Sequence, residues 1–113
     1  MIEASAKVKP WRSAVSAAAH SHYKTMHEGA VSVSLVFLFM RPQGHYGAKG
    51  LRPSAPRWKI TKPDTDKLIR STLDGMTGIA FRDDNQVVMV NAIKRFAEPG
   101  EPQGAIVTVL ELA

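Results

Sequence analysis

Apolar residues recur three or four positions apart in two segments of the chain, the spacing that places side chains on one face of a helix. The first segment begins near Pro10, which suits a first helical turn, and we expect it to stop at Glu28 and Gly29. Its apolar face consists of Trp11, Ala14, Val15, Ala18, Ala19 and Tyr23. The second segment covers residues 64–76 and places Asp66 at the edge of its buried stripe, held by packing yet open to solvent.

Three other segments have the apolar pattern of strands. Residues 31–40 place apolar side chains at every second position, with Ser32 and Ser34 between the first of them. Residues 86–94 and 105–112 are shorter apolar runs. Two helices and three strands predict an α+β fold, in which a small mixed β-sheet packs against the helices within one domain of residues 1–113.

Residues 41–63 have no period and contain four prolines and three glycines, so they predict a long irregular loop. The chain carries a formal net charge of +5, and residues 41–70 alone, with eight basic and two acidic side chains, carry +6. Clustered Lys and Arg favour a polyanionic partner such as nucleic acid, because binding releases counterions from the phosphates. A basic loop that only keeps the protein soluble explains the charge equally well.

The composition excludes several classes of protein. The chain has no cysteine, which excludes disulfide scaffolds, thiolate metal sites and cysteine nucleophiles. Its longest apolar run, residues 31–40, is well short of the ~20 residues that a membrane helix needs, and its first residues do not resemble a signal peptide. Glycine-rich phosphate loops are absent, so we expect no nucleotide cofactor. The expectation is a cytoplasmic protein without membrane contact.

Acidic residues gather around the second predicted helix. Asp64 and Asp66 stand at its start, and Asp83 and Asp84 in the turn that follows it. Such carboxylates could hold a hard divalent ion such as Mg²⁺ against a substrate phosphate. If the next strand runs back along the helix, the acids could meet within one subunit, and otherwise across a dimer interface. Structural roles explain them too: Asp64 as an N-cap, Asp74 paired with Arg70, and Asp83 and Asp84 as turn residues.

The same residues resemble a known family. Residues 62–76 are K-P-D-T-D-K-L-I-R-S-T-L-D-G-M, and residues 82–88 are R-D-D-N-Q-V-V. Both runs resemble, in order and spacing, the K-P-D-x-D-N-L and D-D-x-Q-V-V patterns of the RusA family of Holliday-junction resolvases. Residues 41–47, R-P-Q-G-H-Y-G, are similar to a loop of its phage-type members. The resemblance covers about the last three quarters of the chain.

The resemblance implies a homodimeric endodeoxyribonuclease that depends on Mg²⁺, with Mn²⁺ as a possible substitute. Such an enzyme resolves four-way DNA junctions by paired nicks in DNA recombination and repair. Asp64, Asp66 and Asp84 would be catalytic and bind the metal, Asp83 would be a weaker metal ligand, and Arg70 would take the place of a catalytic lysine. The side chains expected to bind DNA are Arg41, Lys49, Arg52, Arg57, Lys59, Lys62 and Lys67.

Three departures from the family pattern bear on activity. Arg70 keeps a positive charge four residues after Asp66, but a guanidinium cannot shuttle a proton, so electrostatic stabilisation is its expected role. Lys67 replaces an asparagine and could touch phosphate or face solvent. The family's N-terminal strand is expected to be missing, because the chain opens close to its first helix. A catalytically impaired junction-binding module is therefore the alternative, and a protein whose loop docks an acidic partner is a further one.

Two other features of the sequence each have two explanations. Trp58, between Arg57 and Lys59, could stack on an unpaired base at the junction centre, although a packing role also accounts for it. The apolar segments 31–40 and 86–94 are candidates for the dimer interface or for the sheet core.

Overall fold

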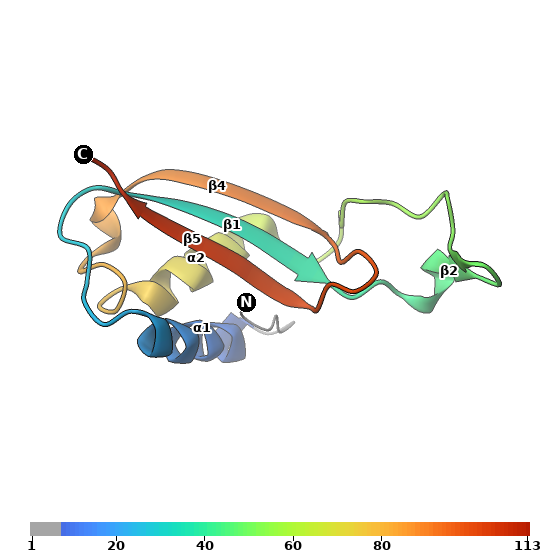
Figure 1. Ribbon diagram of the computed structural model, residues 1–113, viewed down its shortest axis with the longest axis horizontal. Helices are drawn as coiled ribbons and strands as arrows, with labels where there is room; N and C mark the ends of the chain where they lie inside the picture. Colours follow the sequence, from blue (N-terminus) through green and yellow to red (C-terminus); the bar gives the residue numbers. More distant parts are fainter. Residues whose placement is uncertain (1–7) are drawn as a thin grey trace.

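The computed structural model describes residues 8–113 (Figure 1). Helix α1 (Val8–His22) is followed by strand β1 (Val31–Phe39) and then by a long connection. Helix α2 (Thr65–Met76) comes next, and the 3-10 turn η2 (Asp84–Gln86) leads into strands β4 (Val87–Phe96) and β5 (Gly104–Glu111). The expectation that the family's N-terminal strand is missing concerns residues 1–7, which precede α1 and lie outside the described part.

Strand β1 is the centre of a three-stranded sheet with the order β4-β1-β5. It runs parallel to β4 and antiparallel to β5. Because α2 connects β1 to the parallel strand β4, this helix runs back across the sheet in the opposite direction. The predicted α+β fold, with a mixed sheet and two helices, is confirmed.

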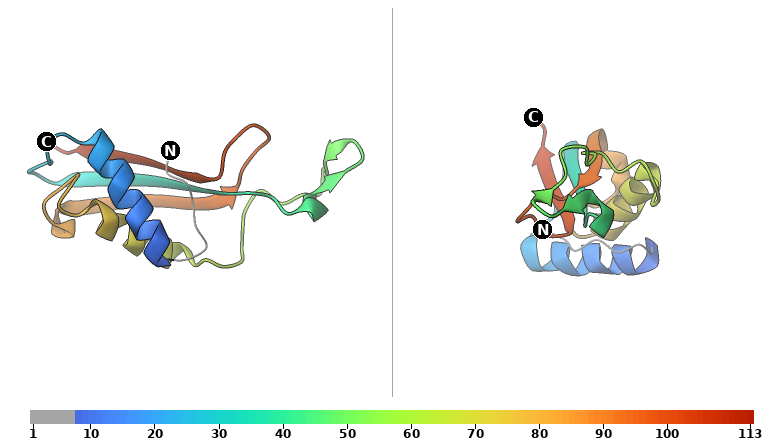
Figure 2. Two further views of the ribbon diagram at one scale, coloured as in Figure 1. Left: turned by 90° about the horizontal axis from the view of Figure 1, so that it is seen from below. Right: turned by 90° about the vertical axis from the view of Figure 1, so that its right-hand side faces the viewer.

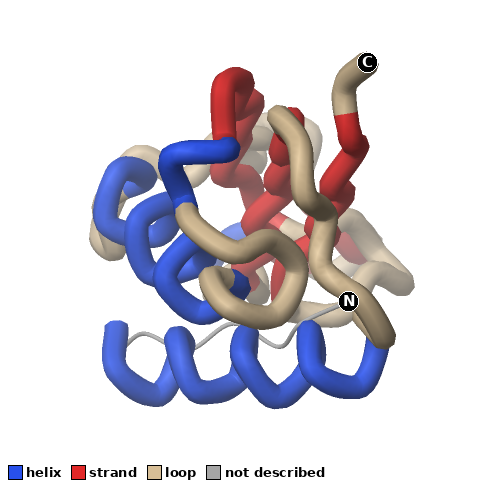
Figure 3. The backbone as a smooth tube through the Cα atoms, turned by 90° about the vertical axis from the view of Figure 1, so that its left-hand side faces the viewer, coloured by secondary structure: helices blue, strands red, loops and turns tan. Residues whose placement is uncertain are grey.

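Both helices pack on one face of this sheet (Figures 2 and 3). The core contains the odd-numbered side chains of β1, residues 31–39, because alternate strand residues point to the same face. From the helices it contains Trp11, Val15, Ala19, Leu68 and Met76. Most of the opposite face is open in the described structure: Leu38 is fully buried there, but Met89, Ile106 and Leu110 are large apolar side chains that stay exposed.

The two helices touch at a glycine. A Cβ atom on Gly75 would lie 2.8 Å from Cγ1 of Val15 and 2.9 Å from the carbonyl oxygen of Arg12. The Ser16 hydroxyl donates to the Gly75 carbonyl at 2.8 Å, and the Trp11 indole donates to Oγ1 of Thr72 at 3.0 Å. The absence of a side chain at residue 75 therefore sets the close approach of α1 to α2.

Helix α1 is shorter than predicted, because it ends at His22 and not at residues 28–29. The reason lies in tertiary pairing: the backbone N–H of His27 donates to the Ala80 carbonyl at 2.9 Å, and His27 forms a bridge with Phe81. A backbone committed to these partners cannot continue the helical ladder.

The connection of residues 40–64, the basic arm, projects beyond the end of the sheet (Figures 1 and 2). It contains the short turn η1 (Gln43–His45) and a small hairpin of strands β2 (Tyr46–Gly47) and β3 (Gly50–Leu51), which the sequence pattern did not predict. The longest dimension of the molecule is 51 Å, against 26 and 22 Å for the others. Among residues 8–113, no helix has the length and apolarity to cross a membrane.

Candidate active site

The start of α2 presents two exposed carboxylates. Asp64 occupies the N-cap position with an extended backbone, but its side chain makes no capping hydrogen bond. Its carboxylate lies 3.8 Å from the ammonium group of Lys67, and both side chains are largely exposed. Asp66 lies in the first turn, exposed, and has no hydrogen-bond or ion-pair partner in the described part of the chain. Neither carboxylate is committed to a strong bond within the fold.

Lys94 holds the backbone just before this pair. Its ammonium group donates to the carbonyl oxygens of Thr61 and Pro63, each at 2.7 Å. Burial and the nearby charge of Lys59 lower the pKa of Lys94, while the negative charge of Asp64 opposes this shift. Lys94 stands in β4 opposite Phe37, so the register of the sheet brings this late residue of β4 back to the start of α2.

The other two acids of the motif have different environments. Asp83 is the N-cap of η2: its carboxylate accepts from the Asn85 N–H at 2.8 Å, while Gln86 accepts from the backbone N–H of Asp83 at 2.9 Å. Asp84 is exposed and has no side-chain partner within residues 8–113. The structure thus gives Asp83 a capping role and leaves Asp84 uncommitted.

Asp84 lies at the far end of α2 from Asp64 and Asp66. Strand β4 does run back along α2, but Asp84 is where this return begins, and Lys94 is what reaches the start of the helix. The 12 residues of α2 span about 18 Å. Figure 1 shows η2, in orange, at the end of the molecule away from the basic arm. Within the described chain, no three His, Asp or Glu side chains form a group that could hold a metal ion.

Helix α2 carries two further charged side chains, Arg70 and Asp74. Arg70 is exposed and forms no ion pair in the part of the chain that the structure describes. Asp74 pairs with Arg12 of α1 at 3.4 Å and not with Arg70. The guanidinium of Arg70 therefore stays available on the helix that carries Asp66.

The basic side chains predicted to bind DNA are mostly exposed. Those exposed in the arm and the first turn of α2 are Lys49, Arg52, Arg57, Lys62 and Lys67. Lys59 is half-buried, with its ammonium group 5.4 Å from the ring centre of Phe39 and 2.7 Å from Oγ1 of Thr61. The outer part of the arm thus presents a basic surface to solvent.

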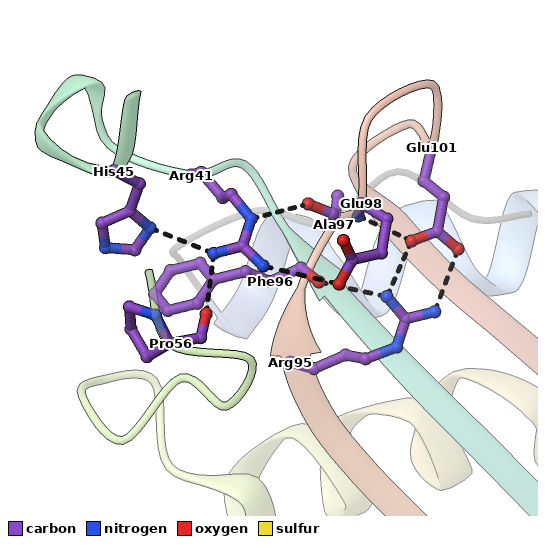
Figure 4. Close-up of polar contacts among 8 residues, drawn as sticks. All are labelled: Arg41, His45, Pro56, Arg95, Phe96, Ala97, Glu98 and Glu101. Carbon is purple, nitrogen blue, oxygen red and sulfur yellow. Dashed lines mark hydrogen bonds and ion pairs between the residues drawn. The ribbon is translucent and has the colours of Figure 1, made fainter. Parts of the chain in front are cut away.

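Arg41 differs from that prediction, because only 2% of its side chain is exposed. Its guanidinium donates to the carbonyl oxygens of Pro56 at 2.7 Å and Ala97 at 3.2 Å, and lies 3.5 Å from the Glu98 carboxylate (Figure 4). These partners leave little of the guanidinium for a phosphate. Arg41 instead links the start of the arm to its later residue Pro56 and to the loop after β4.

Lys94 and Arg41 are the residues whose positions sequence reasoning missed. The signal for Lys94 was a lysine near the end of an apolar strand, at a register position facing the helices. For Arg41 the signal was a charge directly after a strand that is apolar on both faces. Neither signal predicts the role of its side chain without the tertiary partners, which are the carbonyls of Thr61 and Pro63 for Lys94 and those of Pro56 and Ala97 for Arg41.

A family model described as endodeoxyribonuclease RusA matches residues 2–109 of the 113-residue chain. A search of curated proteins found no match. A search of solved structures also found none. The family match covers nearly the whole chain, so the chain belongs to the RusA endodeoxyribonuclease family.

Proposed function

We propose that this member of the RusA endodeoxyribonuclease family resolves four-way DNA junctions by metal-dependent paired nicks. The observation that carries the proposal is the pair of exposed carboxylates, Asp64 and Asp66, directly after the basic arm. Lys and Arg side chains attract the DNA backbone through counterion release. A phosphate held by the arm would therefore lie beside the two carboxylates.

The donor chemistry of the pair suits Mg²⁺ or Mn²⁺. Mg²⁺ usually takes one or two protein carboxylates together with phosphate oxygens and water. Asp66 has no partner within residues 8–113, and Asp64 has only its 3.8 Å contact with Lys67, so binding would displace no strong bond. We assign Asp64, Asp66 and Asp84 as ligands, with Asp83 secondary because its carboxylate already caps η2. A divalent ion in such a site activates water and neutralises phosphate charge.

Residues of the chain would orient the substrate around this pair. Lys94 fixes the carbonyls of Thr61 and Pro63, and so fixes the backbone from which Asp64 projects. Arg70 follows Asp66 by one helical turn and would stabilise negative charge on the phosphate. A guanidinium cannot shuttle a proton as an ammonium group can, so we do not assign Arg70 as the acid or base.

A two-fold dimer would supply Asp84 from the second chain. β4 is an edge strand of the sheet, and its residues Val88, Met89 and Val90 are 60%, 61% and 44% exposed. Exposed apolar edges of this kind invite pairing with another strand. The end of β4 is already occupied, since the Phe96 N–H donates to the Arg57 carbonyl at 3.0 Å. Residues 87–93 are left for a partner.

Antiparallel pairing of two β4 strands about the middle of residues 87–93 aligns the start of one strand with the end of the other. Asp84 of the partner subunit would then lie opposite Phe96, two residues along the strand from Lys94. Lys94 binds the carbonyl that precedes Asp64, so this arrangement brings the partner's Asp84 toward Asp64 and Asp66. It also yields two equivalent sites related by a two-fold axis, as opposed nicks in a four-way junction require.

The test is a cleavage and binding assay with a synthetic four-way junction and a linear duplex of matched arms. We expect nicking of the junction with Mg²⁺ or Mn²⁺, and we expect Asp64→Asn or Asp66→Asn to abolish nicking while leaving binding in EDTA largely intact. Asp74→Asn is the matched control on the same helix, because Asp74 pairs with Arg12 and should not be needed for cleavage. Absence of nicking by the unaltered protein with either ion would overturn the proposal.

A catalytically impaired junction-binding module is the second candidate, and Arg70 is the observation that favours it. Arg70 stands where some members of the family have a catalytic lysine, and an arginine there cannot transfer a proton. This candidate predicts salt-sensitive binding of junctions without a metal-dependent product. Arg70→Lys distinguishes the two: nicking that arises only in this variant identifies a binding module, whereas nicking by the unaltered protein identifies the nuclease.

A further inference from the structure

An apolar groove lies at the base of the basic arm, between the arm and the end of β4. It has a volume of about 510 Å³ and is lined by His45, Pro56, Trp58, Ile60 and Phe96, among others. This volume falls in the range of small-molecule sites, roughly 300–1,000 Å³. Trp58 is 49% exposed and Ile60 is 93% exposed, although both lie in a strongly polar segment. Apolar side chains gathered at one exposed place indicate a binding surface.

The groove has rigid walls. Arg41 binds the Pro56 carbonyl at 2.7 Å and Nδ1 of His45 at 3.3 Å, and its guanidinium lies 5.3 Å from the ring centre of Phe96 (Figure 4). The rings of His45 and Phe96 meet edge to face at 4.7 Å. One buried side chain therefore holds three walls in place, and the groove exists before any ligand arrives.

Trp58 is also fixed in the backbone while its ring stays open. It forms a bridge with Arg95, and the preceding carbonyl of Arg57 accepts from the Phe96 N–H at 3.0 Å. The Arg57 guanidinium lies 5.0 Å from the Trp58 ring centre. A ring with a fixed base, a free surface and a neighbouring cation suits stacking with another flat ring.

The charge around the groove selects the kind of ring. Arg57 and Lys59 flank Trp58, and Lys62 follows within four residues, all within the segment that carries the positive excess of the chain. A flat ring attached to a negatively charged backbone would match both the exposed aromatic ring of Trp58 and the positive charge around it. The groove also stands close to the candidate active site, because its lining residue Thr61 is held by Lys94, which binds the carbonyl just before Asp64.

We infer that this groove receives one unpaired nucleobase of the DNA substrate, stacked on Trp58, while Arg57 and Lys59 contact the adjoining phosphates. The inference rests on the proposed DNA substrate and adds a base-binding subsite to it. A base taken out of the stack at the branch point would position the neighbouring phosphate near Asp64 and Asp66. Trp58 is then a specificity-determining residue for branched over fully paired DNA.

The experiment measures Trp58 fluorescence and affinity with two single-stranded probes of equal length, one with bases and one entirely abasic. The chain has two tryptophans, and Trp11 is fully buried. A change in fluorescence on DNA binding that disappears in Trp58→Phe is therefore assigned to Trp58. We expect the oligonucleotide with bases to quench the Trp58 fluorescence and the abasic one to leave it unchanged. Trp58→Ala should weaken binding of the base-containing probe about 5- to 100-fold, as loss of one stacked base does.

Tyr46→Ala is the matched control, since Tyr46 is an exposed aromatic residue of the same arm outside the groove lining. Equal losses in Tyr46→Ala and Trp58→Ala, or equal quenching by both probes, would overturn the inference. A change in dimerisation without a change in DNA affinity would also overturn it, because a second chain would then cover the groove. Junction against duplex binding, measured in parallel, tests the proposed function separately from the groove.

Discussion

Asp83 and Asp84 are adjacent and exposed, yet only Asp83 uses its carboxylate inside the fold. It caps η2 through the Asn85 N–H, a bond whose loss costs about 1 kcal/mol in capped helices. Asp83→Ala should therefore lower the free energy of unfolding by about 1 kcal/mol, while Asp84→Ala should leave it within about 0.5 kcal/mol. Urea unfolding in EDTA measures both.

Asp83→Asn provides the control for this prediction, because an asparagine oxygen can accept the same backbone N–H. It should retain most of the stability that Asp83→Ala loses. Equal destabilisation by Asp83→Ala and Asp84→Ala would show that the cap contributes nothing measurable.

Glu101 is the acid with the clearest pH dependence. Hydrogen bonds from the Arg95 guanidinium at 2.7 and 2.9 Å, and from the Glu98 N–H at 2.7 Å, lower the pKa of Glu101 from its ordinary 4.5 to about 2. A depressed folded-state pKa contributes stability that is present above pH 4.5 and is lost as the pH falls toward 2. The difference in unfolding free energy between the unaltered protein and Glu101→Gln should shrink over this window.

A direct measurement of the same group is the NMR titration of the Glu101 side-chain carboxyl. We expect a midpoint near 2, which Arg95→Met should move upward toward 4.5. A midpoint of about 4.5 in the unaltered protein would contradict the predicted effect of the Arg95 contact.

Single residues show how far the sequence specifies the candidate site. Asp64 and Asp66 were identified from their spacing at a helix start, because that spacing depends on local structure alone. The buried position of Arg41 was not predicted, because its partners Pro56, Ala97 and Glu98 lie 15 to 57 residues away in the sequence. Long-range acceptors decide whether a basic side chain faces phosphate or the protein interior, and composition carries no record of them.

At the scale of elements, the crossing of α1 and α2 depends on Gly75. A methyl group there would lie 2.9 Å from a backbone carbonyl, which cannot move aside as a flexible side chain can. Overpacking of this kind costs about 1–3 kcal/mol, and the better helix propensity of alanine returns about 1 kcal/mol at most. Gly75→Ala should therefore lower the free energy of unfolding by about 1 kcal/mol, measured by urea denaturation.

Gly44→Ala is the matched control for this substitution, because a Cβ atom there meets nothing within 4 Å. Its free energy of unfolding should stay within about 0.5 kcal/mol of that of the unaltered protein. An unchanged or raised stability in Gly75→Ala would show that the helices move apart without loss.

Elements with a strong period were predicted well, and those fixed by tertiary contacts were not. The strand at residues 31–40 corresponds to β1, whose alternate side chains fill the core. The predicted end of α1 at residues 28–29 lies beyond its actual end at His22, because the backbone of His27 pairs with Ala80 and Phe81 instead of continuing the helix. The β2–β3 hairpin was missed because only Tyr46–Gly47 and Gly50–Leu51 pair, which is too short for an alternating pattern.

At the scale of the whole molecule, the acidic motif is divided between the two ends of α2. The sequence allowed Asp84 to meet Asp64 and Asp66 either within one chain or across a dimer. The topology favours the second arrangement, since Asp84 precedes β4 at one end of α2 and Lys94 returns to the other. In the proposed dimer, each site takes Asp64 and Asp66 from one chain and Asp84 from its partner.

This division predicts complementation between two inactive variants. Asp66→Asn and Asp84→Asn should each abolish junction nicking alone. In a mixed dimer, one site combines both substitutions, but the other combines the intact Asp66 of one chain with the intact Asp84 of the other. An equal mixture, refolded together or coexpressed, should recover about a quarter of the original sites, because half of the dimers are mixed and each holds one intact site.

The product distinguishes this outcome from partial reactivation of either variant. A dimer with one intact site should nick a four-way junction in one strand without the opposed nick, so nicked junctions should accumulate in place of resolved duplexes. The separate variants, mixed without subunit exchange, are the control and should stay inactive. If all three acids acted within one chain, every chain of the mixture would lack one of them, and no nicking would return.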